Sequence, residues 1–147
     1  MEGRAEFPEL ARESGFRGLV VWQMAMGIAA DACLYCQGLP QIEQFALGQQ
    51  IRRCAGSIPA NIAEGYGRDS SKSYIQFLRV AKGSLNELET HLLLAERIGY
   101  APMAPEFYKR IGALGTKLTN LMRRIQDSAV CEPVAGYDAN AAGGDLD

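Results

Sequence analysis

The chain has 147 residues, 48% of them hydrophobic and 22% charged, which is the composition of a globular protein long enough to bury a core as one domain. Its net charge of −2 excludes a strongly basic protein but hides an asymmetry. Residues 19–126 carry twelve Lys and Arg against eight Asp and Glu, whereas residues 127–147 carry five acids and no base. The mildly basic body therefore leaves a polyanionic partner open.

The first residues, "MEGRAEFPEL", contain neither the basic nor the apolar region of a secretory signal. With four cysteines and no export signal, we expect reduced thiols and a cytoplasmic location. Residues 1–18 are expected to form a flexible N-terminal arm. The apolar stretch 19–36 contains Gln23 and Asp31, and an acid costs about 3 kcal/mol at a bilayer centre. A buried helix is therefore expected there, and not a membrane span.

The first predicted helix runs from about Leu19 to Gln37 and ends before Gly38. Asp31 is its one charged residue. Because a surface helix needs a polar face, we expect this helix to be covered both by its own bundle and by a neighbouring subunit. The alternative is an alanine-rich helix with a bland exposed face.

The second predicted helix covers about Ile42 to Glu64, with Gly65 as its stop, and Pro59 interrupts it. A polar stripe lies beside its apolar stripe and predicts a kinked, hydrogen-bonded contact with the next helix, where Gly56 and Gly83 would let the backbones approach. The predicted structural polar network consists of Arg53, Ser57, Asn61, Glu64, Ser84 and Glu87. Alternatively, these groups simply face solvent.

The third helix is expected to begin near Asp69 or Ser70, either of which can cap it, and the fourth near Pro105. Both show apolar residues at alternating spacings of four and three, which favours packing at shallow crossing angles. We therefore predict an all-α, antiparallel up-and-down four-helix bundle over residues 19–127. Residues 128–147 are expected to form an acidic, disordered tail.

Basic residues recur at helical spacing and could follow a phosphate backbone. The stretch "GYGRDSSK", residues 65–72, also places cations beside a helix start, although a capped turn would explain it equally well. The nucleic-acid or anion-binding candidates are Arg68, Lys72, Arg79, Lys82, Arg110, Lys117 and Arg124. The alternative is that they form the solvated face of a bundle.

Catalytic and metal-binding patterns are weak. His91 is the single histidine, so a di-iron bundle site cannot be built within one chain. Glu87 and His91 could form half of a site between subunits, but a hydrogen bond within the helix explains them better. Cys33 and Cys36 form a C-x-x-C pattern without a second pair. We expect no enzyme, no metal and no cofactor.

Several motifs resemble one family. They are "VWQMA" (21–25), "P-x-x-E" (40–43), "L-x-x-QIRR" (47–53), "SIPANIAEGYGR" (57–68), "FLRVAKGSLNELETHL" (77–92) and "RIGY" (97–100). In this order they are similar to the four-helix-bundle proteins called 23S rRNA-intervening sequence proteins. "SIPANIAEG" followed by "GSLNELET" is the most specific part, and the resemblance covers roughly residues 19–125.

This resemblance implies a bacterial, cytoplasmic four-helix bundle that assembles as a homopentamer. It also implies similarity in fold to the accessory protein of diversity-generating retroelements, a basic pentamer that binds nucleic acid and a reverse transcriptase. The family's recurring polar residues correspond here to the network above together with Arg68. Two functions follow as hypotheses, a homo-oligomer that binds the backbone of RNA or DNA and an oligomeric scaffold that binds another protein. A third hypothesis, which the weak catalytic patterns disfavour, is an enzyme or metal carrier that uses Glu64, Glu87 and His91.

Overall fold

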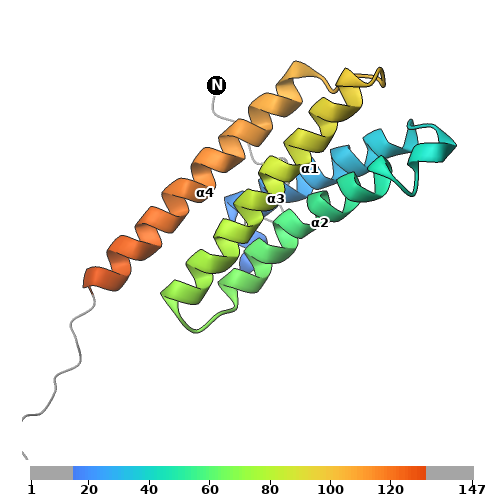
Figure 1. Ribbon diagram of the computed structural model, residues 1–147. Coiled ribbons are helices and arrows are strands. Elements are labelled where there is room, and N and C mark those ends of the chain that lie inside the picture. Colours follow the sequence, from blue (N-terminus) through green and yellow to red (C-terminus); the bar gives the residue numbers. More distant parts are fainter. Residues whose placement is uncertain (1–14, 132–147) are drawn as a thin grey trace, which may run out of the picture.

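The structure is a computed structural model that describes residues 15–131 (Figure 1). It contains four long helices, α1 (Val20–Gln37), α2 (Leu47–Tyr66), α3 (Ser71–Arg97) and α4 (Pro105–Cys131). Two short 3-10 helices, η2 (Phe16–Gly18) and η3 (Gln41–Glu43), precede α1 and α2. The described part of the chain contains no strand, which confirms the prediction of an all-α fold with four helices.

The helices pack side by side, each against the next along the chain and α4 against α1. In Figure 1, α3 lies in front of α1, and α2 and α4 flank them. The apolar positions at 4-3 spacing fill the space between the helices. The largest fully buried side chains are Ile28, Cys36, Ile51, Ile58, Ile62, Leu78, Leu85, Leu88, Leu92, Leu114 and Leu118.

The second helix starts five residues later than predicted, at Leu47 and not at Ile42. The preceding loop is held by side chains that replace helical hydrogen bonds. Gln44 Nε2 donates to the carbonyls of Cys36 and Leu39, both at 2.8 Å, and Arg52 donates to the Gln44 carbonyl at 3.0 Å. Glu43 accepts from the Leu47 amide at 3.2 Å, at the start of α2. Because side chains satisfy these backbone hydrogen-bonding groups, the loop is an alternative to α-helix from residue 42 onward.

The ends of α2 and α3 meet at a tight connection. Gly65 does not stop α2, contrary to the prediction: the helix continues to Tyr66, and Gly65 lies within it, buried against α3. Pro59 is buried inside α2, which continues on both sides of it. Ser70 caps α3, since its Oγ accepts from the Ser73 amide at 3.1 Å. Ser70 is one of the two residues predicted for this cap.

The structure describes only part of the predicted N-terminal arm and C-terminal tail. Helix α4 begins at Pro105, as predicted, and continues to Cys131, so residues 128–131 of the expected tail are helical. The rest of that tail, 132–147, and residues 1–14 of the expected arm lie outside the described residues. No helix within residues 15–131 has both the length and the apolar character needed to cross a membrane.

Candidate functional site

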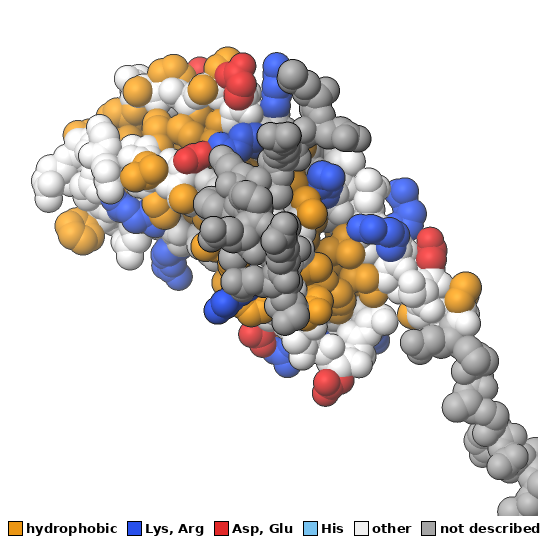
Figure 2. All heavy atoms as spheres, turned by 180° about the vertical axis from the view of Figure 1, so that it is seen from behind, with side chains coloured by type: hydrophobic (Ala, Val, Ile, Leu, Met, Phe, Trp, Pro, Cys, Tyr) orange, Lys and Arg blue, Asp and Glu red, His pale blue; other side chains and the backbone are white. Residues whose placement is uncertain are grey.

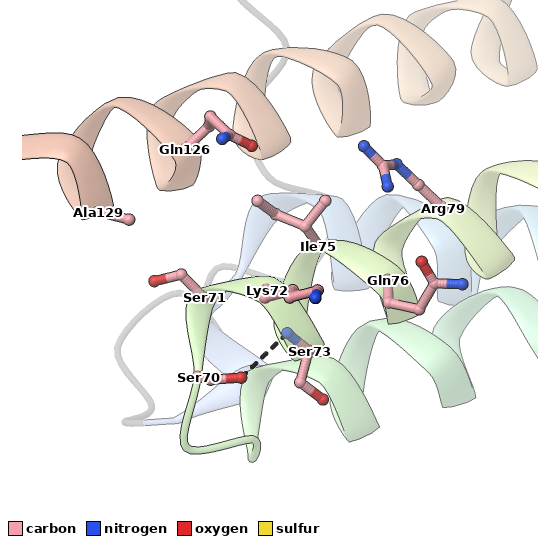
Figure 3. Close-up of a pocket in the computed structure, with 9 residues that line it drawn as sticks. All are labelled: Ser70, Ser71, Lys72, Ser73, Ile75, Gln76, Arg79, Gln126 and Ala129. Carbon is pink, nitrogen blue, oxygen red and sulfur yellow. Dashed lines mark hydrogen bonds between the residues drawn. The ribbon is translucent and has the colours of Figure 1, made fainter.

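A hollow of about 690 Å³ lies where the start of α3 meets the end of α4 (Figure 3). Lys72 and Arg79 line it from α3, and Gln126 and Ala129 line it from α4. In Figure 3 the Arg79 guanidinium extends toward α4, and Ile75 points into the space between the two helices. The hollow therefore presents two cations together with Ile75, and serine and glutamine side chains make up most of the remaining lining.

A second hollow follows farther along the same two helices. It is lined by Lys82 of α3 and by Gly112, Gly115, Thr116, Thr119, Asn120 and Arg123 of α4. Lys82 Nζ donates to Thr119 Oγ1 at 2.6 Å, which fixes the lysine across the helix junction. Lys82 lies three residues from Arg79, and Arg123 three from Gln126, so both hollows occupy one edge of each helix. We call Lys72, Arg79, Lys82 and Arg123 the basic seam.

The surroundings of the seam are also basic. Residues 71–86 contain three cations and no acid, and residues 117–131 contain three cations against Asp127. The segment between them, residues 87–116, contains four acids against three cations and one histidine. Positive charge therefore exceeds negative charge along the first part of α3 and the last part of α4, and not along the segment between them.

The structure does not gather all seven predicted cations. Arg68 pairs with Glu64 at 2.5 Å and lies 4.6 Å from the centre of the Phe77 ring. Arg110 pairs with Asp31 of α1 at 2.5 Å, so its edge of α4 faces α1. Lys117 and Arg124 follow Arg110 at intervals of seven residues, which places them along that same edge and away from α3.

Three of the predicted cations, Lys72, Arg79 and Lys82, thus belong to the seam, and Arg123 joins them although it was not among the candidates. A signal for Arg123 exists in the sequence. It lies four residues after Thr119 and three before Gln126, and therefore on their face of α4. The seven-residue spacing of Arg110, Lys117 and Arg124 instead favoured the edge of α4 that faces α1.

The centre of the predicted polar network joins α2 to α3. The hydroxyl oxygens of Ser57 and Ser84 lie 2.9 Å apart, and Ser84 is buried. Asn61 Nδ2 donates to the Ser57 carbonyl at 2.7 Å and to the Ser57 hydroxyl at 2.9 Å. These three residues form a compact hydrogen-bonded cluster between the helices.

The charged members of the network lie elsewhere, which corrects the predicted set. Arg53 is exposed, and the side chains of Glu64 and Glu87 are 55% and 54% exposed. Glu64 pairs with Arg68, and Glu87 lies 3.5 Å from His91 Nε2, each one helical turn away. These ionic groups remain hydrated because they lie outside the helix contact.

The predicted close approach at Gly56 and Gly83 was wrong. A Cβ atom at either position would have no other atom within 4 Å. The close approach is at Gly65, where a Cβ would lie 2.8 Å from Phe77 Cβ. The helices α2 and α3 thus approach each other closely near their connection, where glycine leaves room for the α3 residues.

A separate apolar groove lies between α1 and α2. Its lining is almost entirely hydrophobic and small, and consists of Trp22, Met26, Ala29, Ala30, Cys33, Gly56, Pro59, Ala60 and Ala63. Figure 2, which views the molecule from behind, shows hydrophobic side chains gathered at the surface with lysine and arginine side chains around them. Ile42 and Phe45 of the loop before α2 are also exposed, by 81% and 82%.

The four cysteines form no disulfide bond with one another, and two of them, Cys36 and Cys54, are buried. Burial raises the pKa of the Cys54 thiol to about 11, and the nearby Glu87 charge adds to this effect. Burial likewise raises the pKa of Cys36. Within residues 15–131 no three His, Cys, Asp or Glu side chains come together as a metal site would require. Cys33 and Cys36 have no such partners there.

Comparison with known proteins places this arrangement in a family. The family model of the 23S rRNA-intervening sequence protein matches residues 17–124, which include α1 to α3 and most of α4. The chain belongs to the 23S rRNA-intervening sequence protein family. The match confirms the resemblance described above.

A crystal structure of a protein from a bacterium is similar to this member of the family. It is a protein with unknown function from the S23 ribosomal protein family of Bacteroides thetaiotaomicron. It shares 29% sequence identity at a TM-score of 0.56, over 71% of this chain and 96% of that one. A search of the curated proteins found no match.

Proposed function

We propose that this protein is a non-enzymatic, homo-oligomeric bundle that binds the phosphate backbone of RNA or DNA along the basic seam. The observation that carries the proposal is the alignment of Lys72, Arg79, Lys82 and Arg123 on facing edges of α3 and α4. No acid lines either hollow. Cations in such a row can replace the counterions of successive phosphates.

The small residues of the seam support this proposal. Gly112, Gly115 and Thr116 lie beside Lys82 and Arg123 and leave the helix junction open to an approaching backbone. Hydroxyl and amide groups of Thr116, Asn120 and Gln126 can donate hydrogen bonds to phosphate oxygens. The site lacks a row of aromatic side chains, so we expect backbone contacts and little sequence preference.

Fluorescence-anisotropy titration with labelled structured RNA and duplex DNA tests this function. Four phosphate contacts predict that the logarithm of the affinity for duplex DNA falls with the logarithm of salt concentration at a slope of about −3.6. The affinity should then fall about 150-fold between about 50 and 200 mM salt. An absence of binding to either nucleic acid at micromolar protein and low salt would refute the proposal.

The proposed assembly uses the apolar groove between α1 and α2, with a pentamer favoured and the helices in antiparallel, up-and-down order. The groove supports it because an open apolar surface of this kind favours a protein contact. The same observation favours the alternative function, an oligomeric scaffold that binds another protein without nucleic acid. In that case the basic seam would be a solvated surface only.

Replacing Ala30 with Glu tests the assembly. Ala30 is exposed in the groove, so the charge should leave the fold intact but separate the subunits. Light scattering should show about 80 kDa for five copies of the 16.0 kDa chain in the wild type and a smaller mass in the variant. Ala113→Glu, on the exposed surface of α4, is the matched control. A wild-type mass of one chain would contradict the assembly.

A further inference from the structure

We infer that the acidic segment 132–147 of this chain docks on the basic seam and competes with nucleic acid for it. The segment contains Glu132, Asp138, Asp145 and Asp147 and no lysine or arginine. It lies outside the described residues, and α4 ends immediately before it, at Cys131. The inference rests on the proposed function only in naming what the segment competes with.

The place where α4 ends favours this contact. Ala129, two residues before the end of the helix, already lines the hollow that contains Lys72 and Arg79. The segment therefore starts beside the groove that it would occupy. Its carboxylates would be near the seam at a high effective concentration, which favours contact within the chain over contact with a free anion.

The length of the segment is sufficient. Lys72 and Lys82 are ten residues apart on α3, which corresponds to about 15 Å along the helix. Asp138 follows Glu132 by six positions, and an extended chain of six steps spans about 20 Å. The two carboxylates can therefore reach the two ends of the α3 side of the seam.

The charges are complementary as well. The seam offers four cations, and its immediate surroundings carry a single acid, Asp127, within residues 71–86 and 117–131. The segment offers four carboxylates. Ion pairs at an exposed surface are individually weak and screened by salt. We therefore expect a reversible contact that holds at low salt and that added salt or nucleic acid displaces.

Zero-length carbodiimide cross-linking of the full chain tests the contact without nucleic acid. Amide bonds should join carboxylates of residues 132–147 to Lys72 and Lys82, and 1 M salt should abolish them. Lys109 and Lys117 are exposed on α4 and within the reach of the segment, so they are matched control lysines. Equal cross-linking of all four lysines would overturn the inference. Links that join differently labelled chains in preference to a single chain would also overturn it.

A charge-neutral segment tests the competition in the full-length protein. The variant Glu132→Gln, Asp138→Asn, Asp145→Asn, Asp147→Asn should bind structured RNA about tenfold more tightly at low salt. The control variant Glu87→Gln, Glu89→Gln, Glu96→Gln, Glu106→Gln changes the net charge equally but away from the seam, and should change the affinity less than threefold. Equal gains in the two variants would show a net-charge effect and overturn the inference.

The two experiments separate this inference from the proposed function. Cross-links confined to Lys72 and Lys82, with no nucleic-acid binding by any variant, would support the docked segment and refute the nucleic-acid function. Nucleic-acid binding that is unchanged in the charge-neutral variant, with cross-links spread over all four lysines, would support the nucleic-acid function and refute the docked segment.

Discussion

Ser84 is buried on α3, and its hydroxyl oxygen lies 2.9 Å from the hydroxyl oxygen of Ser57 of α2. A hydroxyl in such a contact contributes stability only while it is paired. The Ser57, Ser84 and Asn61 cluster satisfies this requirement through bonds of 2.7 to 2.9 Å. It therefore fixes how α2 and α3 are aligned along their axes.

Replacing Ser84 with Ala should lower the free energy of unfolding by about 1 kcal/mol, since one buried hydrogen bond is lost. Chemical denaturation at a fixed protein concentration measures this change. Ser71→Ala, at an exposed position of the same helix, should change it by less than about 0.5 kcal/mol. Equal effects at the two positions would show that the cluster is not stabilising.

The thiol of Cys54 predicts a dependence of stability on pH. Its pKa is about 11 in the folded chain against an ordinary value of 9.0, so the folded state holds the proton more tightly. The contribution is complete below pH 9 and is lost as the pH rises toward 11. The free energy of unfolding should therefore fall across this range, and the raised pKa values of Cys36 and Tyr74 act in the same direction.

The variant Cys54→Ala should show a smaller decline between pH 9 and 11, measured by denaturation at several pH values. Cys131 is exposed at the end of α4, so Cys131→Ala should leave the decline unchanged. An identical decline in wild type and Cys54→Ala would contradict the assignment.

At the residue scale, the sequence predicted the neutral polar cluster but not the exposure of the charged residues Arg53, Glu64 and Glu87. The spacing of Ser57 and Asn61 places them on one stripe, and Ser84 lay on the expected partner helix. Spacing cannot tell whether a residue on the margin of that stripe is inside or outside the contact. Arg53 and Glu64 lie on that margin and are exposed, so loss of either charge should cost little.

At the scale of the elements, Gly65 is a position of close approach between α2 and α3. A methyl group there would lie 2.8 Å from Phe77 Cβ and 3.2 Å from the Tyr74 carbonyl oxygen. Neither atom is the end of a flexible side chain. The backbones would have to separate, which disturbs the packing of both helices.

Gly65→Ala should lower the free energy of unfolding by about 1–3 kcal/mol, as overpacking does. Gly83→Ala is the matched control, because a Cβ at residue 83 meets nothing within 4 Å. There, alanine should raise the stability by about 0.5–1 kcal/mol, because it favours helix more than glycine does. A stabilising Gly65→Ala would contradict the close approach.

The four helices were predictable because each carries a long apolar repeat, and Ser70 and Pro105 mark two of their starts. The start of α2 was not predictable, since residues 42–46 have no feature that excludes a helix. Their conformation depends on hydrogen bonds from Gln44 to Cys36 and Leu39, which form only once α1 and the loop are folded. Gly65 was predicted to stop the second helix because it follows Glu64. Its observed part in the close contact with α3 could likewise be recognised only from the fold.

At the scale of the whole molecule, the basic seam and the apolar groove lie on different pairs of helices. The basic seam follows α3 and α4, and the apolar groove follows α1 and α2. Because the two surfaces lie on different helix pairs, assembly through the groove would leave the seam accessible. The sequence predicted basic residues on these helices. Only the fold shows that the basic residues of α4 lie on two edges, one facing α3 and the other facing α1.

Matched charge variants test the seam most directly, by the salt dependence of binding to duplex DNA. Lys72→Gln, Arg79→Gln, Arg123→Gln removes three seam charges, and Lys109→Gln, Lys117→Gln, Arg124→Gln removes three exposed charges elsewhere. The seam variant should bind more weakly, with a salt slope reduced by about 2.7, while the control keeps the wild-type slope. A slope that falls equally in both variants, or only in the control, would contradict binding at the seam.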